Sequence, residues 1–373
     1  MQTHTPLIGL RQLLDEDLEA VCGALTGELG EISGGTLLIT GGGGFLGYYL
    51  VQAVLHWNDT RAARGRIQLT VYDNYLNGVP GWLEALRSRP DLTLRRHDMT
   101  QPLPADIGHF DYIVHAAGIG SPIFYRAQPL KCIDANIIGL RNLLDYAVAR
   151  RSSGRPVRGF LFYSSSEIYG DPPPEAIPTP ETYRGNVSCT GPRACYDESK
   201  RFGETLCVTF ARQEQIPVTI ARPFNNYGPG LKITDGRVLP DFARDVFAGR
   251  DIMMLSDGSP KRTFCYATDA VTGYFKVLVR GRAGEPYNIG IDRPEISIGE
   301  LARQVATAAS ELLGYGGKVI LGRSSEADYL VDNPNRRCPS INKARAELGY
   351  EPRVDIAVGI RRSLIWYSHH RAA

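Results

Sequence analysis

A tyrosine and a lysine four residues apart form the residue pair in this sequence best suited to acid–base chemistry. Of the 19 tyrosines, only Tyr196 has a lysine at the fourth position after it, Lys200, in the segment GPRACYDESKRFGETL. On a helix this spacing places both side chains on one face. An ammonium group beside a phenol favours the phenolate, so we expect Lys200 to lower the pKa of Tyr196 toward the range of a general base.

A second polar segment, SSSE at 164–167, follows an apolar run that we expect to be a strand. Catalytic side chains gather where parallel strands end. Ser165 or Ser166 could therefore share the proton of a substrate hydroxyl with Tyr196, and Glu167 brings a carboxylate to the same edge. Beside a nicotinamide cofactor, these groups suit removal of a proton from an alcohol while its hydride passes to the cofactor.

A glycine-rich turn supplies the matching dinucleotide site. Gly41, Gly44 and Gly47 in TGGGGFLG follow an apolar run and open a helical stretch. The first glycine permits the tight turn, the second lets a pyrophosphate approach the backbone, and the third allows close packing of helix on strand. The phosphates would lie on free N–H groups at the helix N-terminus, so Phe45 and Leu46 belong to the same predicted site.

The ends of the following strands complete this site. Asp73, in VYDNY, is placed to accept hydrogen bonds from a ribose diol and to repel a 2′-phosphate, which favours NAD over NADP. A role as an ordinary turn residue fits Asp73 less well, because Asp73 ends the strand that follows the glycine turn and its helix. The small residues of the next strand end suit either a cofactor or close packing. The other predicted cofactor contacts are Asn74, Asp98, Met99, Ala116, Ala117 and Gly118.

Alternating apolar and helical segments predict the fold that positions these groups. Nearly continuous apolar runs are typical of strands covered by helices on both faces. They alternate with helical stretches, which predicts an α/β, Rossmann-type doubly wound parallel sheet with a smaller C-terminal substrate-binding domain. The predicted strands are 36–40, 67–72, 92–97, 111–117, 159–165 and 218–224.

Three regions follow from these patterns. Apolar residues at helical spacing over 10–29 predict an amphipathic helix that packs on the next domain or on a partner subunit, within an N-terminal helical extension of residues 1–34. Residues 35–228 form mainly the NAD-binding domain. We expect residues 229–373, rich in Gly and Pro between helices, to form mainly the smaller substrate-binding domain, and the chain is free to cross back between the two.

Composition excludes several other classes of protein. In 373 residues, 42 Lys and Arg balance 40 Asp and Glu, and the charges are mixed along the chain, so we expect no nucleic-acid partner. No apolar run has the length of a membrane span and the acidic N-terminus does not fit a secretory signal, which predicts a cytoplasmic protein without a membrane partner. The seven scattered cysteines predict buried thiols, and neither they nor the histidines have metal-site spacing.

Taken together, TGGGGFLG, YDNY, HDMT, SSSEIYG, YDESK and ARPFNNYGP resemble the extended short-chain dehydrogenases/reductases that act on nucleotide sugars. The resemblance runs from about residue 35 to 365. Within this NAD-dependent epimerase/dehydratase family, three segments are similar to the UDP-glucuronate decarboxylases, or UDP-xylose synthases: 121–136, 183–201 and 333–352. The resemblance implies a tightly held NAD, a UDP-linked sugar substrate and a homodimer joined by helices of the Rossmann half.

The resemblance also implies a role for each site residue. Tyr196 would start oxidation at C4 of the sugar, Lys200 would lower its pKa and bind the nicotinamide ribose, and Ser165 and Ser166 would hold the C4 hydroxyl. A ketone at C4 lies β to the C6 carboxylate, which is then readily lost as carbon dioxide. Further roles would be carboxylate chemistry for Glu167, Arg337 and Tyr125, and a diphosphate contact for Arg262. Asn225 would contact either the diphosphate or the sugar, and nucleotide contacts would lie around Arg237.

Other reactions of the family stay open at this point. The dTDP-glucose dehydratases have an Asp where Ser166 stands, and 4-epimerases usually lack the carboxylate at position 167, yet GDP-mannose dehydratases share the Ser-Glu pair. UDP-apiose/xylose synthases are a close alternative, and a non-catalytic NAD-binding protein is a distant one because the Tyr and Lys are both present. The additional first 34 residues, GIGSP at 118–122 and SSSE depart from the family pattern, and the last two put the exact sugar acid in question.

Overall fold

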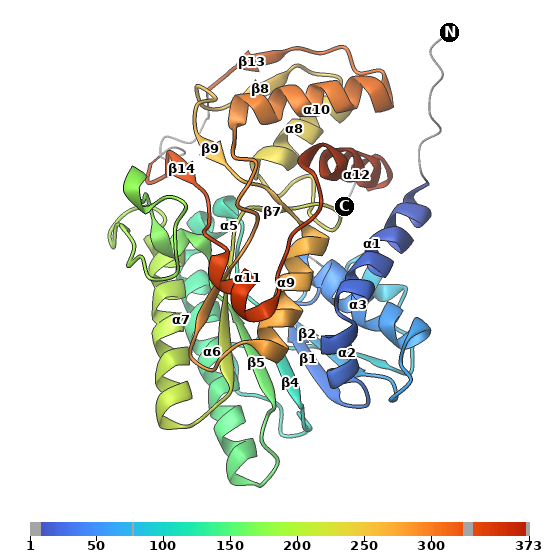
Figure 1. Cartoon of the computed structure of the whole chain (residues 1–373), viewed down its shortest axis with the longest axis vertical. Helices are drawn as coiled ribbons and strands as arrows, with labels where there is room; N and C mark the ends of the chain where they lie inside the picture. Colours follow the sequence, from blue (N-terminus) through green and yellow to red (C-terminus); the bar gives the residue numbers. More distant parts are fainter. Residues whose placement is uncertain (1–8, 77, 324–330, 371–373) are drawn as a thin grey trace.

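The computed structural model describes residues 9–76, 78–323 and 331–370, and a seven-stranded sheet forms the centre of its larger lobe (Figure 1). The strand order is β11-β6-β5-β4-β1-β2-β3, and every neighbouring pair is parallel. This confirms the predicted doubly wound parallel sheet. The strands are β1 (Thr36–Thr40), β2 (Gln68–Asp73), β3 (Leu92–Arg96), β4 (Tyr112–His115), β5 (Gly159–Tyr163), β6 (Val218–Pro223) and β11 (Pro286–Ile289).

Six of these strands lie within or one residue beyond the predicted runs, whereas β11 was not predicted. It has four residues, begins with a proline and contains Asn288, so it lacks the continuous apolar run of its neighbours. The Asn288 side chain is nevertheless buried, because its amide donates to the Thr179 and Ser340 carbonyls at 2.9 and 3.0 Å. The chain therefore crosses back from the second half to complete the sheet.

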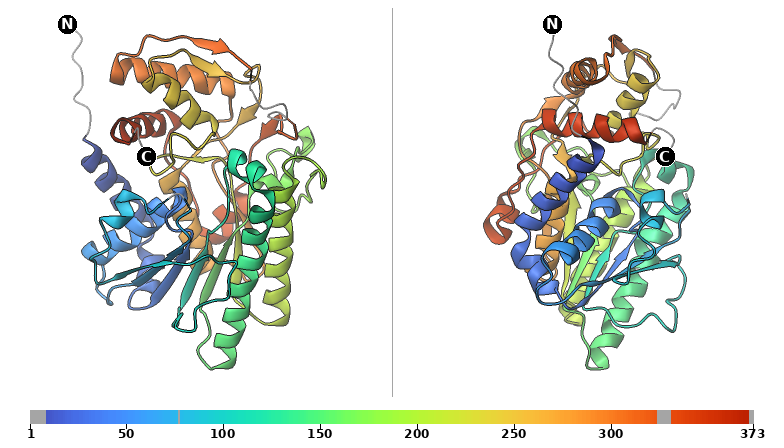
Figure 2. Two further views of the ribbon diagram at one scale, coloured as in Figure 1. Left: turned by 180° about the vertical axis from the view of Figure 1, so that it is seen from behind. Right: turned by 90° about the vertical axis from the view of Figure 1, so that its right-hand side faces the viewer.

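Helices cover both faces of the sheet, which explains the apolar strands. On one face lie α6 (Pro129–Ser152) and α7 (Ala194–Gln213), packed over a core that includes Leu140, Phe160 and Ile220. On the other lie α3 (Phe45–Thr60), α9 (Ala267–Arg280) and α11 (Asn342–Leu348). In the right-hand view of Figure 2, the green helices and the blue N-terminal helices stand on opposite sides of the sheet.

The N-terminal segment forms two helices, α1 (Leu10–Ala24) and α2 (Thr26–Ile32), where the sequence predicted one over 10–29. That prediction was wrong at Leu25, whose backbone leaves the helical region at φ −114° and ψ 20°. The turn lets Leu25 itself become fully buried along with Leu13 and Val21. Both helices pack on the chain's own α9, and α1 also contacts α3 and α12 (Ile356–His369).

A buried carboxylate fixes α1 in this position. Asp17 is 1% exposed and accepts hydrogen bonds from the hydroxyls of Tyr49 on α3 and Tyr266 on β10 (Cys265–Tyr266), the latter at 2.7 Å. It also pairs with the guanidinium of Arg362 on α12. Burial raises the pKa of Asp17, and these partners oppose that effect. One side chain therefore connects the N-terminal helix with three other elements.

The smaller lobe surrounds a separate apolar core. Its helices α8 (Val238–Phe247), α10 (Ile298–Leu313) and α12 pack around residues that include Phe242, Val305 and Ile360. Short strands complete the chain: β7 (Asn226–Tyr227) with β10, β8 (Ile252–Met254) with β13 (Val319–Leu321), and β12 (Ile296–Ser297), β9 (Lys261–Arg262) and β14 (Arg336–Arg337) in one sheet. The domain boundaries after residues 34 and 228 stay predictions, since α9 and β11 return to the larger lobe.

Short helices line the space between the lobes: α4 (Gly81–Glu84), α5 (Pro122–Ala127) and the 3-10 turn η1 (Ser166–Tyr169). A second 3-10 turn, η2 (Pro174–Ala176), borders a separate, smaller pocket. Among the described helices, none is both long and apolar enough to cross a membrane. Over the same residues, no group of three His, Cys, Asp or Glu side chains is arranged to hold a metal ion. Five of the seven cysteines are buried, while Cys195 is half-buried and Cys189 is exposed.

Replacing Asp17 tests its part in the fold. We expect Asp17→Ala to lower the free energy of unfolding by about 3 to 5 kcal/mol, because it leaves the buried side of Arg362 and two tyrosine hydroxyls without their acceptor. Urea denaturation measures this change. Asp15→Ala removes an exposed carboxylate from the same helix and serves as the control; equal effects of the two substitutions would contradict the role of Asp17.

Candidate active site

One open cleft of about 1620 Å³ lies between the strand ends of the larger lobe and the smaller lobe. Every site residue selected from the sequence lines it, which places groups from opposite ends of the chain on one surface. These residues are Gly41, Gly44, Phe45, Leu46, Gly47, Asp73, Asn74, Asp98, Met99, Ala116, Ala117, Gly118, Tyr125, Ser165, Ser166, Glu167, Tyr196, Lys200, Asn225, Arg237, Arg262 and Arg337.

The glycine turn leaves no room for side chains. Gly41 has a φ of 73°, and a Cβ there would lie 2.7 Å from the backbone of Ala117. A Cβ at Gly47, in the first turn of α3, would lie 2.1 Å from the Gly42 carbonyl oxygen. The turn therefore packs directly against both the helix and the end of β4. Its bare backbone and the first amides of α3 form a cradle that fits a pyrophosphate.

Asp73 closes this cradle at the end of β2. Its Oδ2 accepts from the Gly43 amide at 3.0 Å and its Oδ1 from the Tyr75 amide at 2.8 Å, so the carboxylate is fixed beside the glycine turn. Burial raises the pKa of Asp73, and the two amides oppose that effect. The amide and hydroxyl of Thr100 donate to Asp98 at the end of β3, and together with Asn74 they hold its pKa below the usual value. The residues present thus fit the predicted NAD.

Tyr196 and Lys200 lie in the first two turns of α7, on the face toward β5. The Lys200 ammonium donates to the Tyr163 carbonyl at 2.8 Å and lies 5.7 Å from the centre of the Tyr196 ring. Burial raises the pKa of Tyr196 to about 12, opposed by the nearby Ser165 side chain. Burial also lowers the pKa of Lys200 to about 8. The structure thus differs from the expectation that Lys200 lowers the Tyr196 pKa, because desolvation outweighs the distant ammonium.

The two candidate serines are not equivalent. Ser165 lies close enough to the Tyr196 phenol to oppose the rise in its pKa, and the Ser165 hydroxyl accepts from the Glu167 amide at 3.2 Å, which caps η1. Ser166 is buried as the first residue of that turn. Of the two, Ser165 is therefore the one that acts on the phenol.

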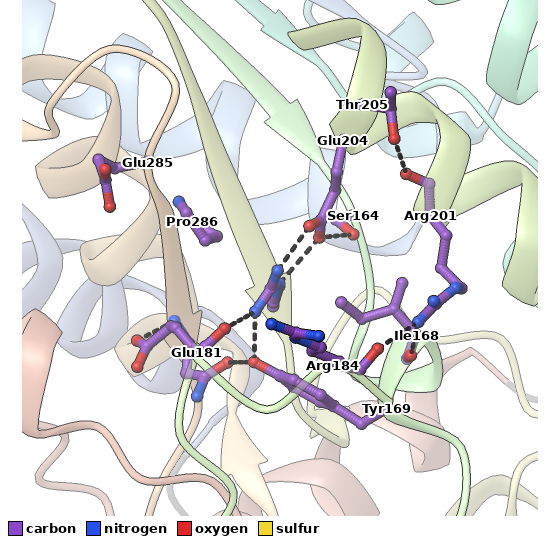
Figure 3. A network of polar contacts seen from close by, with 12 residues as sticks. Ser164, Ile168, Tyr169, Glu181, Arg184, Arg201, Glu204, Thr205, Glu285 and Pro286 are labelled. Atoms are coloured by element: carbon purple, nitrogen blue, oxygen red, sulfur yellow. Dashed lines mark hydrogen bonds and ion pairs between the residues drawn. The ribbon is translucent and has the colours of Figure 1, made fainter. Parts of the chain in front are cut away.

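A buried network behind the cleft holds this serine segment in place (Figure 3). Ser164 donates to Glu204 of α7 at 2.5 Å, and Arg222 of β6 donates to the same carboxylate at 2.6 and 2.8 Å. Arg222 also donates to the Tyr169 hydroxyl at 2.6 Å and to the Glu181 carbonyl at 2.9 Å. Both ends of the segment are therefore anchored to α7 and β6, a link that the sequence analysis missed.

Glu167 is held between two arginines. Arg337 donates to both carboxylate oxygens, at 2.5 and 2.6 Å, and Arg193 donates to Oε2. The two guanidinium groups outweigh burial and hold the pKa of Glu167 below its usual range. Glu167 is thus an ionised acceptor in this arrangement. Sequence analysis missed Arg193, although its place three residues before Tyr196, at the start of α7, is a signal that could have found it.

Tyr125 stacks on the reactive tyrosine. Its ring lies 5.0 Å from that of Tyr196, centre to centre, with an angle of 12° between the planes. The Tyr125 hydroxyl is buried and has no hydrogen-bond partner among the described residues, and burial raises the pKa of this phenol. The stack fixes the orientation of the Tyr196 ring.

The remaining predicted contacts come mainly from the smaller lobe. Arg262 donates to the Lys261 and Pro334 carbonyls at 2.8 and 2.5 Å, and burial together with Arg337 and Arg193 lowers its pKa to about 9. Asn225 donates to the Thr263 carbonyl at 3.0 Å. Arg237 reaches across the cleft to the Gly120 carbonyl at 3.2 Å. All three line the cleft, and their roles toward a diphosphate stay predictions.

Comparison with known proteins gives the family. The model of the NAD dependent epimerase/dehydratase family matches residues 37–290. The chain belongs to this family. UDP-glucuronic acid decarboxylase 3 of Arabidopsis thaliana is 37% identical over 324 residues, which cover 87% of this chain and 86% of that protein. UDP-glucuronic acid decarboxylase 1 of Xenopus tropicalis is 35% identical, over 89% of this chain and 72% of that protein.

Solved structures agree on the fold. The dTDP-glucose 4,6-dehydratase DesIV from Streptomyces venezuelae, a structure with NAD bound, has a TM-score of 0.75 and 25% identity, covering 90% of this chain and 98% of that one. UDP-glucose 4-epimerase from Thermotoga maritima has a TM-score of 0.74 and 22% identity, covering 90% and 99%. The same fold thus serves different reactions, so the reaction must be argued from the site.

The position of the Asp73 carboxylate predicts that the protein prefers NAD to NADP. We expect the protein to bind NAD more tightly than NADP. Asp73→Asn should reduce the ratio of the Kd for NADP to the Kd for NAD by about ten-fold, because the repulsion of a 2′-phosphate is lost. Titration calorimetry measures both affinities. Asp98→Asn removes the same charge elsewhere in the cleft and should change the ratio less; equal affinity of the unmodified protein for both dinucleotides would contradict the assignment.

Proposed function

We propose that this protein is an NAD-dependent decarboxylase that converts UDP-glucuronate, or a related nucleotide uronic acid, to a UDP-pentose through a 4-keto intermediate. The observation that carries the proposal is the pairing of Glu167 with Arg337 in the same cleft as Tyr196. It places a guanidinium that can meet a sugar carboxylate beside a phenol that can act on an alcohol. The decarboxylases that are 37% identical to this chain support the same assignment.

Named residues would hold the cofactor. The glycine turn from Gly41 to Gly47 suits the pyrophosphate, Asp73 the adenosine ribose, and Lys200 the nicotinamide ribose. When bound, NAD accepts a hydride from C4 of the sugar and returns it at the end of the cycle. The chain's own residues would move protons and stabilise charge.

In its phenolate form, Tyr196 would take the proton of the C4 hydroxyl, with Ser165 hydrogen-bonded to the same oxygen. Oxidation leaves a ketone β to the carboxylate, so the bond between C5 and C6 breaks with loss of carbon dioxide and its electron pair forms an enolate with C4. Hydrogen bonds from Tyr196 and Ser165 to the C4 oxygen stabilise this charge, a contribution that elsewhere is worth about 3 to 4 kcal/mol per donor. C5 then takes up a proton before C4 is reduced.

Recognition of the substrate would use both lobes. Arg262, Asn225 and Arg237 are proposed to bind the diphosphate and nucleotide, and Tyr125 to approach the sugar carboxylate. A homodimer through α6 and α7 is part of the proposal. Leu130 and Phe202 on these helices are 75% and 48% exposed, which gives this face an apolar character. The cytoplasmic location predicted from the sequence is also part of it.

The first test is turnover of UDP-glucuronate by the purified protein, with and without added NAD. We expect carbon dioxide release and a product lighter than the substrate by one carbon dioxide; turnover without added NAD would show that the cofactor is retained through the cycle. A branched pentose in the product would indicate the UDP-apiose/xylose synthase reaction. An unchanged mass with an altered C4 configuration, or loss of water from a UDP-hexose, would contradict decarboxylation.

Tyr196→Phe separates catalysis from cofactor binding. We expect turnover to fall by about 10² to 10⁴-fold while NAD still binds, because the proton acceptor is lost but the glycine turn and Asp73 are not touched. Carbon dioxide release and NAD titration measure the two effects. Tyr183→Phe, on a tyrosine outside the main cleft, is the control. Unchanged turnover in Tyr196→Phe would refute the role of the phenol.

A further inference from the structure

Arg193 connects the reactive helix with the carboxylate on the cleft wall. It immediately precedes α7, and its own carbonyl accepts from the amides of Tyr196 and Asp197 at 3.0 and 3.1 Å. Its side chain is 9% exposed and donates to Glu167 Oε2. The backbone and the side chain of one residue are therefore attached to the phenol's helix and to the opposing carboxylate.

We propose that Arg193 is a positioning residue of the reaction, which fixes the Glu167 carboxylate against Arg337 on the cleft wall next to Tyr196. The inference rests on the proposed decarboxylase function and adds a residue to it. Arg337 alone binds both oxygens of Glu167 through one plane of its guanidinium. The second donor, Arg193 at the start of α7, prevents the Glu167 carboxylate from rotating relative to the guanidinium plane of Arg337.

The charges around the pair support this assignment. On its other side, Arg193 Nε lies 3.8 Å from Oδ2 of Asp197, a 4% exposed carboxyl whose Oδ1 has no hydrogen-bond partner among the described residues. Burial and the nearby Glu167 raise the pKa of Asp197, which favours its protonated form. The cation of Arg193 is therefore directed to Glu167 instead of being shared equally between two carboxylates.

Other charged and titratable groups face this cluster from every adjacent element. Arg337 comes from β14, Asp332 from the segment before it, and Arg262 from β9; Tyr125 of α5, Cys132 of α6 and Cys195 of α7 lie on the Tyr196 side. Arg337 and Arg193 are the groups among these that lower the pKa of Glu167. Arg193, Arg337 and Glu167 together carry two positive charges and one negative charge. This group therefore keeps a net positive charge, which suits an anionic sugar.

The first experiment compares the pH dependence of turnover in variants. Arg193→Met should lower kcat for UDP-glucuronate about ten-fold or more with NAD affinity unchanged. It should also bring an acid limb into the pH profile, since the pKa of Glu167 rises by about one unit or more when a paired cation is removed and activity is lost as pH falls through the new value. Arg193→Lys keeps the charge and should restore the pH profile in part.

Arg212→Met is the matched control, because it removes an exposed guanidinium from the last turn of the same helix. It should leave kcat and the pH profile unchanged. A purely structural role for Arg193 predicts lower activity with the pH profile of the unmodified protein, and that result would overturn the proposal.

A second measurement does not depend on turnover. In protein labelled with ¹³C at glutamate Cδ, the Glu167 resonance is identified by its absence in Glu167→Gln and followed by NMR over acidic pH. We expect it to stay ionised below the usual range of a glutamate in the unmodified protein, and to titrate at higher pH in Arg193→Met or Arg193→Lys. If the unmodified protein releases no carbon dioxide, the proposed function fails; if the resonance titrates identically in all variants, the positioning role fails.

Discussion

The ion pair between Glu167 and Arg337 joins residues 170 positions apart and connects the two lobes along one wall of the cleft. A buried charge is tolerated only when its partners satisfy it, so the position of each lobe is constrained by this pair. The serine segment of the larger lobe and strand β14 of the smaller lobe must therefore lie in the correct position relative to each other. The alignment of Tyr196, Ser165 and the sugar-binding groups depends on that meeting.

Burial sets the acid–base properties of the site more than any single neighbour does. The same desolvation raises the pKa of Tyr196 to about 12 and lowers that of Lys200 to about 8, because it disfavours the phenolate and the ammonium alike. Glu167 escapes this effect only through two guanidinium groups. At neutral pH the cleft thus holds Tyr196 as the phenol, Lys200 still mostly as the ammonium, and Glu167 as the carboxylate.

The sequence predicted six strands of the seven-stranded sheet and a set of site residues that all line the cleft, because glycine spacing, strand-end acids and the Tyr-Lys pair each depend on local pattern. Strand β11 was missed because its four residues are stabilised by partners such as Thr179, more than one hundred positions away. The break at Leu25 depends on packing against α9, and no residue marks it. The Tyr196 pKa and the role of Arg193 depend on burial and on side-chain direction, which spacing alone does not give.

The attachment of α1 has a consequence for the order in which the chain folds. Asp17 lies on α1, whereas its cation, Arg362, lies 345 positions later on α12. Until α12 is complete, docking α1 would bury a carboxylate without its counter-charge, which is costly. We therefore expect α1 to dock only once α12 is in place, because Asp17 then meets its counter-charge.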